Sequence, residues 1–322
     1  MFIFRIFSRL IVLWVILLGI LGYTYPHSLK IFEPYKDWFF IITMVGIGIV
    51  LRPEDFIPII KAPYWVLLGT LAQFTIMPLG GFFVAKILNL PPKLAVGVII
   101  AGATPGAMAS NVISYLAGAD VAYSVALTST STLLSPIITP LWTYILGSVY
   151  LSVPFWDMFM SIVKMVILPL ICGFGIRYFL GDKVNKIIEV FPALSTLCIA
   201  FICGLVVALN AEKFSQLSIL VFLAVILHNF LGLSLGYFAG ILYRFDEKRK
   251  RTLAIEVGMQ NAGLGAVLAL NHFSSETALP NALFATWCIV TASILAEFWR
   301  RIDTMKVRNK KVNLLQKEIE GE

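Results

Sequence analysis

The sequence is poor in charged residues, and this scarcity sets its class. Only 13% of its 322 residues are Asp, Glu, Lys or Arg, whereas 59% are hydrophobic. A soluble globular domain carries about 25% charged residues. The mean hydropathy is +0.89. These values exclude an ordinary soluble domain and predict an integral membrane protein.

Cysteine, histidine and enzyme motifs are scarce as well. The four cysteines lie in apolar stretches, which favours buried free thiols over disulfides or metal ligands. No cluster of Cys, His or paired carboxylates would suit a transition metal or Ca²⁺. The chain has no Gly-x-Ser-Gly, Gly-x-Gly-Asp or His-Glu-x-x-His motif, so we expect that it is not an enzyme.

Long apolar runs, in contrast, are abundant. A membrane-spanning helix needs about 20 predominantly apolar residues. Proline, glycine and charged residues separate the runs, as in Arg52-Pro-Glu-Asp55. The sequence therefore predicts an all-α protein with ten transmembrane helices, at 7–25, 37–51, 63–88, 94–116, 121–148, 155–180, 191–209, 217–243, 250–272 and 280–300.

The positive charges agree with ten spans and with both termini in the cytoplasm. Nineteen of the 25 Lys and Arg residues then lie on the inner face, and Lys164 lies within a span. Such a bias is the usual orientation signal in membrane proteins. The net charge of +7 is thus explained by topology rather than by nucleic-acid binding. We expect a cell-membrane protein without an obligate protein partner, whose outer-face cations are Lys30, Lys36, Lys86, Lys93 and Lys213.

Two polar, glycine-containing interruptions divide the chain into halves. They run from Thr104 to Asn111 and from Glu256 to Gly263, in the fourth predicted span of each half. Five spans per half would insert the second repeat, 154–300, upside down relative to the first, 1–150, with 301–322 as a cytoplasmic tail. Unpaired backbone groups are costly in lipid, so paired breaks of this kind mark the binding site of a transporter with inverted repeats.

Glu256 is the single residue that most strongly indicates a functional site. A carboxylate at mid-membrane costs about 2.5–3.5 kcal/mol, so it should face a cavity and have a partner. An ion pair with Lys164 is the alternative to a functional role. Gln260 shares the helix face of Glu256 at i+4, and Asn261 lies at the break itself.

Hydroxyl groups surround the other break. Ser110 and Asn111 lie within it, and a stripe of hydroxyls in the next span follows helical spacing. Such hydroxyls can simply allow close helix packing. One carboxylate with several neutral oxygens suits a monovalent cation, Na⁺ above all, and protonation of Glu256 is the alternative. The stripe consists of Ser124, Thr128, Ser131 and Ser135.

The breaks also predict a seat for an anion. New helix N-termini arise near Met108 and near Ala262, each with unpaired N–H groups and a partial positive charge. Pro105 suits a first helical turn, and Gly106 permits a tight reversal. Two such ends that converge would hold a carboxylate or a sulfonate. The candidate substrate-binding residues are Thr104, Pro105, Met108, Ala109, Asn111, Asn261 and Ala262.

Other polar residues within the spans have structural interpretations. His228 and Asn229 form either a satisfied core pair or a proton-linked group, and we favour the pair. Gly232, Gly236 and Gly240 follow the small-xxx-small pattern of closely packed helices. An interfacial ion pair with the following arginines, Arg300 and Arg301, accounts for Glu297.

Taken together, these residues resemble the bile acid:sodium symporter family and its bacterial members. The most specific segments are Pro105–Asn111, Ser124–Thr128, Leu134–Pro136 and Glu256–Asn261. The resemblance implies a ten-helix inverted-repeat fold in which the discontinuous fourth and ninth helices cross at mid-membrane. It also implies a panel domain from spans 7–25, 37–51, 155–180 and 191–209, and a core domain from the other six.

The resemblance implies two sodium sites behind that crossing. By motif position, the first would use Ser110, Asn111, Ser124, Thr128 and Glu256. The second would use Gln73, Glu256, Val257, Met259 and Gln260, with Val257 and Met259 contributing their carbonyls. Gln73 could instead bond a neighbouring helix. At Met108, some bacterial members carry a threonine that faces the substrate.

The expected function is sodium-coupled import of an organic anion by alternating access. The anion would be bile-acid-like, pantoate, or a 2-oxo or other carboxylic acid. A proton-coupled transporter with Glu256 as the proton carrier is one alternative. An uncoupled channel or binding protein is another.

Overall fold

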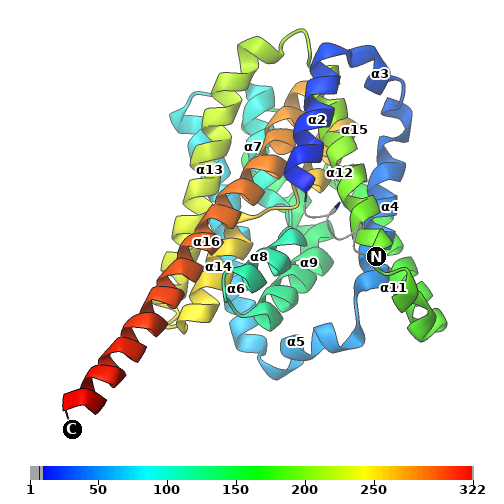
Figure 1. The fold of residues 1–322 in the computed structure, drawn as a ribbon. Helices are drawn as coiled ribbons and strands as arrows, with labels where there is room; N and C mark the ends of the chain where they lie inside the picture. The colour runs from blue at the N-terminus through cyan, green and yellow to red at the C-terminus, as the bar shows by residue number, and fades with distance from the viewer. Residues whose placement is uncertain (1–6, 8–9, 321–322) are drawn as a thin grey trace.

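The computed structural model describes residue 7 and residues 10–320, and the described chain is helical (Figure 1). Extended pairing in the described residues is limited to one isolated antiparallel bridge, between Gly106 and Gln260. The helices of the first half are α2 (Ile11–Thr24), α3 (Pro26–Lys30), α4 (Lys36–Val50), α5 (Ile57–Lys61), α6 (Pro63–Ile87), α7 (Pro92–Ala103), α8 (Ala109–Leu116) and α9 (Val121–Gly147).

The second half continues in the same way. A π-helical turn, Val163–Ile167, interrupts the span that α10 begins and α11 completes. The helices are α10 (Phe155–Ile162), α11 (Leu168–Leu180), α12 (Val190–Leu209), α13 (Phe214–Leu242), α14 (Glu247–Gly258), α15 (Ala262–His272) and α16 (Ser275–Glu320).

Each of the ten predicted spans falls on helical structure, but not every one is a single long helix. Six described helices are long and apolar enough to cross a membrane, counting 155–180 as one. The pair 11–24 and 26–50 is bent by 112° and would add a seventh if it were one span. The fourth and ninth predicted spans are each split into two short helices. The six long helices confirm a membrane protein, and the total of ten crossings remains a prediction.

The helices pack as two groups. In the first, which we name the panel group, α12 packs against α2 and α4, and α4 packs against α11. In the second, the core group, α6 packs on α7, α9 and α13, while α13 packs on α14 and α16 packs on α7 and α15. In Figure 1, α4, α11 and α12 of the panel group lie on the right, and α13, α14 and α16 of the core group lie on the left. Fewer contacts join the groups: α12 packs on α16 and α15, α4 packs on α15, and α2 packs on α16.

Glycines bring the backbones together within each group. A Cβ built on Gly48 of α4 would lie 2.3 Å from the Leu170 carbonyl oxygen of α11. On α13, the predicted stripe is confirmed, because Gly236 and Gly240 would place a Cβ within 3.0 Å of α14 backbone atoms. Only glycine permits such approach, so the stripe lays α14 directly along α13.

The surface is apolar and the interior contains the polar groups. Large hydrophobic side chains are strongly exposed, including Ile60, Ile87, Phe179 and Ile219 at 77–85%. Glu256, by contrast, is fully buried. A surface of this kind fits lipid rather than water, because soluble monomers rarely expose extended apolar patches. The last span continues without a break into the tail, since α16 runs as one 46-residue helix that projects beyond the others (Figure 1).

Candidate cation and anion site at the two broken helices

The first break lies between α7 and α8 and follows from local sequence. Thr104 is extended, with φ −70° and ψ 157°, because a residue before proline disfavours the α region. Pro105 has no N–H to continue the helix. Two hydroxyls satisfy the freed carbonyls: Thr104 Oγ1 donates to Ala101 O at 2.8 Å, and Thr139 Oγ1 of α9 donates to Ala103 O at 2.8 Å.

The second break lies between α14 and α15 and contains no proline. Met259 is extended, with φ −113° and ψ 111°. Here amides satisfy the freed carbonyls: Asn229 Nδ2 of α13 donates to Gly258 O, and Gln260 Nε2 donates to Val257 O, both at 2.8 Å. Asn261 then caps α15, because its Oδ1 accepts the Leu264 N–H at 3.2 Å.

The two breaks bond to each other. Ala107 N donates to Met259 O at 3.0 Å, and Asn261 N donates to Pro105 O at 2.8 Å. Backbone N–H and C=O groups that lose their partner within one helix at its break are therefore bonded by the other break. Such pairing is needed because unpaired polar groups are costly in an apolar environment. Four half-helix ends meet at this bridge: the negative ends of α7 and α14 and the positive ends of α8 and α15.

Three hydroxyls converge on the carboxylate of Glu256. Ser110 Oγ and Ser124 Oγ both donate to Oε1, and Thr128 Oγ1 lies 3.1 Å from Oε1 and 3.0 Å from Oε2. Asn111 Oδ1 completes the group, 2.9 Å from Ser124 Oγ and 3.3 Å from Thr128 Oγ1. The five residues predicted for the first sodium site are thus brought together by α8, α9 and α14.

This group has more oxygen acceptors than protons. Each hydroxyl carries one proton, while an ionised carboxylate and an amide oxygen only accept. Thr128 Oγ1 alone has both Glu256 oxygens, Asn111 Oδ1 and the Ser124 carbonyl within reach. A set of neutral and anionic oxygens short of protons is suited to a small hard cation.

Sequence reasoning missed one member of this group, Ser114. Its Oγ donates to Ser124 Oγ at 3.2 Å, and the side chain is fully buried. The available signal was its position four residues after Ser110, which places both hydroxyls on one face of α8.

Unpartnered amides gather beside the other side of the carboxylate. Gln73 of α6 is fully buried, and neither its Oε1 nor its Nε2 has a partner in the described residues. A Cβ on Gly106 would lie 2.8 Å from Glu256 Oε2 and 3.2 Å from Gln73 Nε2. Gln260 Oε1 also lacks a partner among the described atoms. A bond from Gln73 to a neighbouring helix, the alternative for this residue, is therefore not formed.

The carbonyls expected at the second sodium site are both engaged once. Val257 O accepts from Gln260 Nε2, and Met259 O accepts from Ala107 N. A carbonyl oxygen has two lone pairs, so each keeps one for a cation. With the unpartnered Gln73 and Gln260 oxygens and Glu256, these groups fit the donor set that a sodium ion requires.

Lys164 does not pair with Glu256. The lysine is exposed in the π-helical turn. Within the described residues, the side-chain partners of Glu256 are the three hydroxyls named above. The ion-pair alternative is therefore wrong, because the two residues face different environments.

The hydroxyl stripe of α9 divides into two parts. Ser124 and Thr128 contact Glu256, and Ser131 Oγ accepts the Gly106 N–H at 3.3 Å. Ser135 Oγ instead donates to the Thr132 carbonyl of its own helix at 2.8 Å. Only the first three residues of the stripe take part in the site.

The predicted substrate-binding residues divide by exposure. Met108, Ala109, Asn111 and Asn261 are half-buried at the starts of α8 and α15. The start of α15 faces the panel group, since a Cβ on Gly263 would lie 3.7 Å from both Phe40 of α4 and Ile199 of α12. The structure leaves the remaining three fully enclosed in the bridge between the breaks: Thr104, Pro105 and Ala262.

His228 and Asn229 are both buried but turn to different helices. His228 Nε2 lies 2.9 Å from Met77 O of α6. Asn229 bonds the second break, and its Oδ1 accepts the Thr291 hydroxyl of α16 at 2.7 Å. They are core residues as predicted, but they are not a pair.

The broken helices are also bonded at their ends farthest from the breaks. At one end, Arg251 Nη1 of α14 donates to Ala117 O, the residue that follows α8, at 3.0 Å. At the other end, Glu276 after α15 pairs with Lys93 at the start of α7, at 3.1 Å, and with Lys213 at 2.6 Å. Both broken helices are thus held at the ends and at the central bridge.

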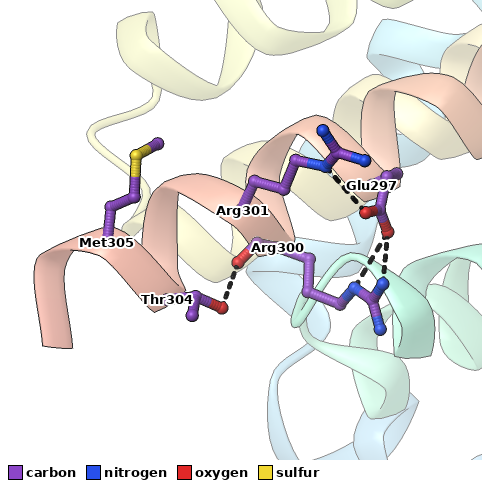
Figure 2. Close-up of a pocket in the computed structure, with 5 residues that line it drawn as sticks. All are labelled: Glu297, Arg300, Arg301, Thr304 and Met305. Carbon is purple, nitrogen blue, oxygen red and sulfur yellow. Dashed lines mark hydrogen bonds and ion pairs between the residues drawn. The ribbon is translucent and has the colours of Figure 1, made fainter. Parts of the chain in front are cut away.

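A shallow cleft of about 480 Å³ lies elsewhere, on α16. Figure 2 shows its lining, in which Arg300 and Arg301 both donate to Glu297, as predicted, and Thr304 bonds the Arg300 carbonyl. These side chains are already paired and are largely exposed. The cleft shares no residue with the site at the breaks.

Comparison with known proteins identifies the family of the chain. A sequence model of the Sodium Bile acid symporter family matches residues 38–217. The chain is 39% identical over 303 residues, 94% of each chain, to the uncharacterized sodium-dependent transporter YocS of Bacillus subtilis. It is 36% identical to the probable sodium/metabolite cotransporter BASS1 of Arabidopsis thaliana, over 90% of this chain and 73% of that protein. Sodium/bile acid cotransporter 4 of Mus musculus is 28% identical over 69% of this chain.

Proposed function

This chain belongs to the Sodium Bile acid symporter family, and we propose that it is a sodium-coupled symporter that imports an organic anion by alternating access. The observation that carries the proposal is the proton-poor set of oxygens around the buried Glu256 carboxylate, at the bridge between two broken helices. Relatives named as sodium-dependent transporters support the choice of ion.

We assign a first sodium site to Ser110, Asn111, Ser124, Thr128 and Glu256. On sodium binding, the three hydroxyls would turn their protons away and offer lone pairs to the cation. The ion would then contact the acceptor oxygens of this group, which the three hydroxyl protons are too few to satisfy. One charge in the site balances one carboxylate, so the buried region becomes neutral.

We assign a second sodium site to Gln73, Glu256, Gln260 and the carbonyls of Val257 and Met259. Its support is the set of unpartnered amide oxygens of Gln73 and Gln260. The C-terminal end of α14 adds a partial negative charge. Both sites share Glu256, so two bound sodium ions would leave one net positive charge in the buried region, which a monovalent anionic substrate would balance.

The anion would sit on the opposite side of the bridge. The positive ends of α8 and α15 meet there, and the start of α15 lies against apolar side chains of the panel group. The polar contacts would come from the half-buried residues at these two helix starts, which include Asn111 and Asn261. An anionic head with an apolar body matches this combination of helix ends and apolar wall.

Transport would follow from movement of the core group against the panel group. One side-chain bond joins them near the end of α15, where Asn271 Nδ2 donates to Asp37 Oδ1 of α4 at 2.8 Å, and a second ties α15 to α10, where His272 Nε2 lies 2.9 Å from Ser161 Oγ. These would break when that end opens. If two sodium ions accompany one monovalent anion, the membrane potential adds about 2.3 kcal/mol per 100 mV. The proposed location is the cell membrane, with both termini cytoplasmic.

The test begins with ligand identification. Organic anions are screened by thermal shift on the purified chain with and without Na⁺, because ligands of the folded state raise its apparent stability. Uptake of the stabilising anion is then measured in proteoliposomes. We expect saturable accumulation that stops when choline replaces Na⁺ and persists when the pH gradient is collapsed. Dependence on the pH gradient alone would instead identify a proton symporter, and passive equilibration would identify a channel.

A further inference from the structure

The second break is built around a buried asparagine for which the proposed function has no role. Asn229 of α13 is 1% exposed. Its Nδ2 donates to Gly258 O at 2.8 Å, at the last residue of α14. Its Oδ1 accepts Thr291 Oγ1 of α16 at 2.7 Å. The Gly258 carbonyl can only accept, so it fixes which end of the amide faces the break, and the Thr291 hydroxyl holds the other end.

This contact holds one peptide unit at both of its polar atoms. The Gly258 carbonyl is bonded to Asn229, and the N–H of the same peptide, on Met259, donates to Ile255 O at 2.9 Å. The peptide plane between Gly258 and Met259 therefore cannot rotate without losing a buried hydrogen bond. The carbonyls on either side of this peptide, Val257 O and Met259 O, are those of the proposed second sodium site.

The packing of α13 brings Asn229 to this place. Gly232, Gly236 and Gly240 follow it on one face of the helix and lie against α14. A Cβ on Gly232 would come within 3.0 Å of the Gly258 Cα and 3.1 Å of Val257 O. The glycine stripe thus fixes the register of α13 along α14, and Asn229 is the polar group at the end of that stripe.

We infer that Asn229 is a positioning residue for the second cation site: held by Thr291, it fixes the Gly258–Met259 peptide so that the flanking carbonyls are directed for Na⁺. The inference rests on the proposed function. Groups that orient metal ligands from the next shell matter nearly as much as the ligands, and their loss costs about 10–100-fold in metal affinity.

The chain provides a matched control in Asn281 of α16. This asparagine is also fully buried, and its Nδ2 donates to a glycine carbonyl, Gly97 O, at 2.9 Å. Gly97, however, lies inside the continuous part of α7, away from either break. A purely structural contribution of such a bond would appear in both variants, whereas an effect on sodium affinity should appear in one.

The experiment measures equilibrium binding of ²²Na⁺ to the full purified chain in detergent, together with its melting temperature. We expect Asn229→Ala and Asn229→Asp to weaken sodium binding by about ten-fold or more. Asn281→Ala should leave it within about two-fold of wild type, although both variants lower the melting temperature. Thr291→Val, which keeps Asn229 but frees its amide, should weaken binding by a smaller factor of about three and stands in if the Asn229 variants do not fold.

Sodium affinity unchanged in the Asn229 variants, or in Thr291→Val if those do not fold, would overturn this inference and leave the proposed function standing. Equal weakening in Asn281→Ala would do the same, because the effect would then be general destabilisation. A wild-type chain that binds no ²²Na⁺ would overturn the proposed function and the inference with it.

Discussion

The two breaks occupy matching positions in the chain but are made in different ways. The first contains Pro105 and Gly106, and hydroxyls from Thr104 and Thr139 satisfy its carbonyls. The second lacks proline, and amides from Asn229 and Gln260 satisfy its carbonyls.

Because different side chains bond the freed carbonyls, different groups remain available for ligands at the two breaks. At the first break the acceptors are used by short hydroxyl side chains, and what remains available is the positive start of α8. At the second, Gln260 Oε1 and the nearby Gln73 amide remain unpartnered in the described structure, next to Glu256. The second break thus contributes four of the nine proposed cation ligands, and the first contributes the Ser110 hydroxyl, the Asn111 amide and a helix N-terminus.

The largest effect should come from Glu256, which serves both breaks. Glu256→Gln removes the only formal charge among the proposed ligands. We expect ²²Na⁺ binding to weaken by about 100-fold or more, because Coulomb attraction in a low dielectric is worth several kcal/mol. Glu297→Gln, at an exposed carboxylate paired with two arginines, should bind sodium like wild type. Sodium-stimulated uptake that survives in Glu256→Gln would reject the assignment.

The next effect distinguishes the two breaks by their glycines. Gly106→Ala would place a methyl 2.8 Å from Glu256 Oε2, so we expect sodium affinity to fall by about ten-fold. Gly263→Ala would meet only ordinary contacts at 3.7 Å, on the side that faces the panel group. It should change the affinity for the organic anion and leave sodium affinity within about two-fold of wild type. If both variants changed sodium binding alike, the separation of roles would be incorrect.

A smaller effect should arise at the cap of the first break. Thr139→Val leaves the Ala103 carbonyl buried without its donor and should cost about 1–3 kcal/mol of stability, measured by thermal denaturation. Sodium affinity should stay within about two-fold, in contrast to the Asn229 variants. Thr143→Val is the control, since among the described residues that hydroxyl bonds the Thr139 carbonyl of its own helix alone. A large loss of sodium affinity in Thr139→Val would show that Thr139 and Asn229, which donate to a freed carbonyl at each break, act in the same way.

The smallest effect concerns the tie between the ends of the broken helices. A hydrogen bond from Lys213, and a second from Lys93, lower the pKa of Glu276 from its ordinary value of 4.5. A lowered pKa in the folded state adds stability above pH 4.5 that is lost as the pH falls below this value. The lysines are more than half exposed, so Glu276→Gln should cost at most about 1 kcal/mol at pH 7. The difference in melting temperature from wild type should shrink as the pH falls below 4.5, and a difference that does not shrink would exclude the ion pairs as its source.

The sequence predicted where two helices break, whereas the ligands assigned at the breaks and the count of ten crossings stay predictions. Breaks at Thr104–Asn111 and Glu256–Gly263 are confirmed, because proline, glycine and polar residues inside apolar runs cannot remain helical without partners. The lysine partner suggested for Glu256 was wrong, since charge alone does not say which face a residue occupies. Ser114, Thr139 and Asn229 were not recognised as parts of the breaks. In the sequence, a hydroxyl or amide that bonds a break cannot be told from one that only packs between helices.

Local composition by itself determined that the chain is a membrane protein, where its helices are interrupted, and that a lone carboxylate lies at the second interruption. These properties depend on neighbouring residues and on the cost of polar groups in lipid. Only the tertiary structure decided that the two interruptions bond to each other and which oxygens surround Glu256. Those contacts join residues more than 100 positions apart, such as Ser110 with Glu256, and they exist because α8, α9, α13 and α14 pack in one particular register.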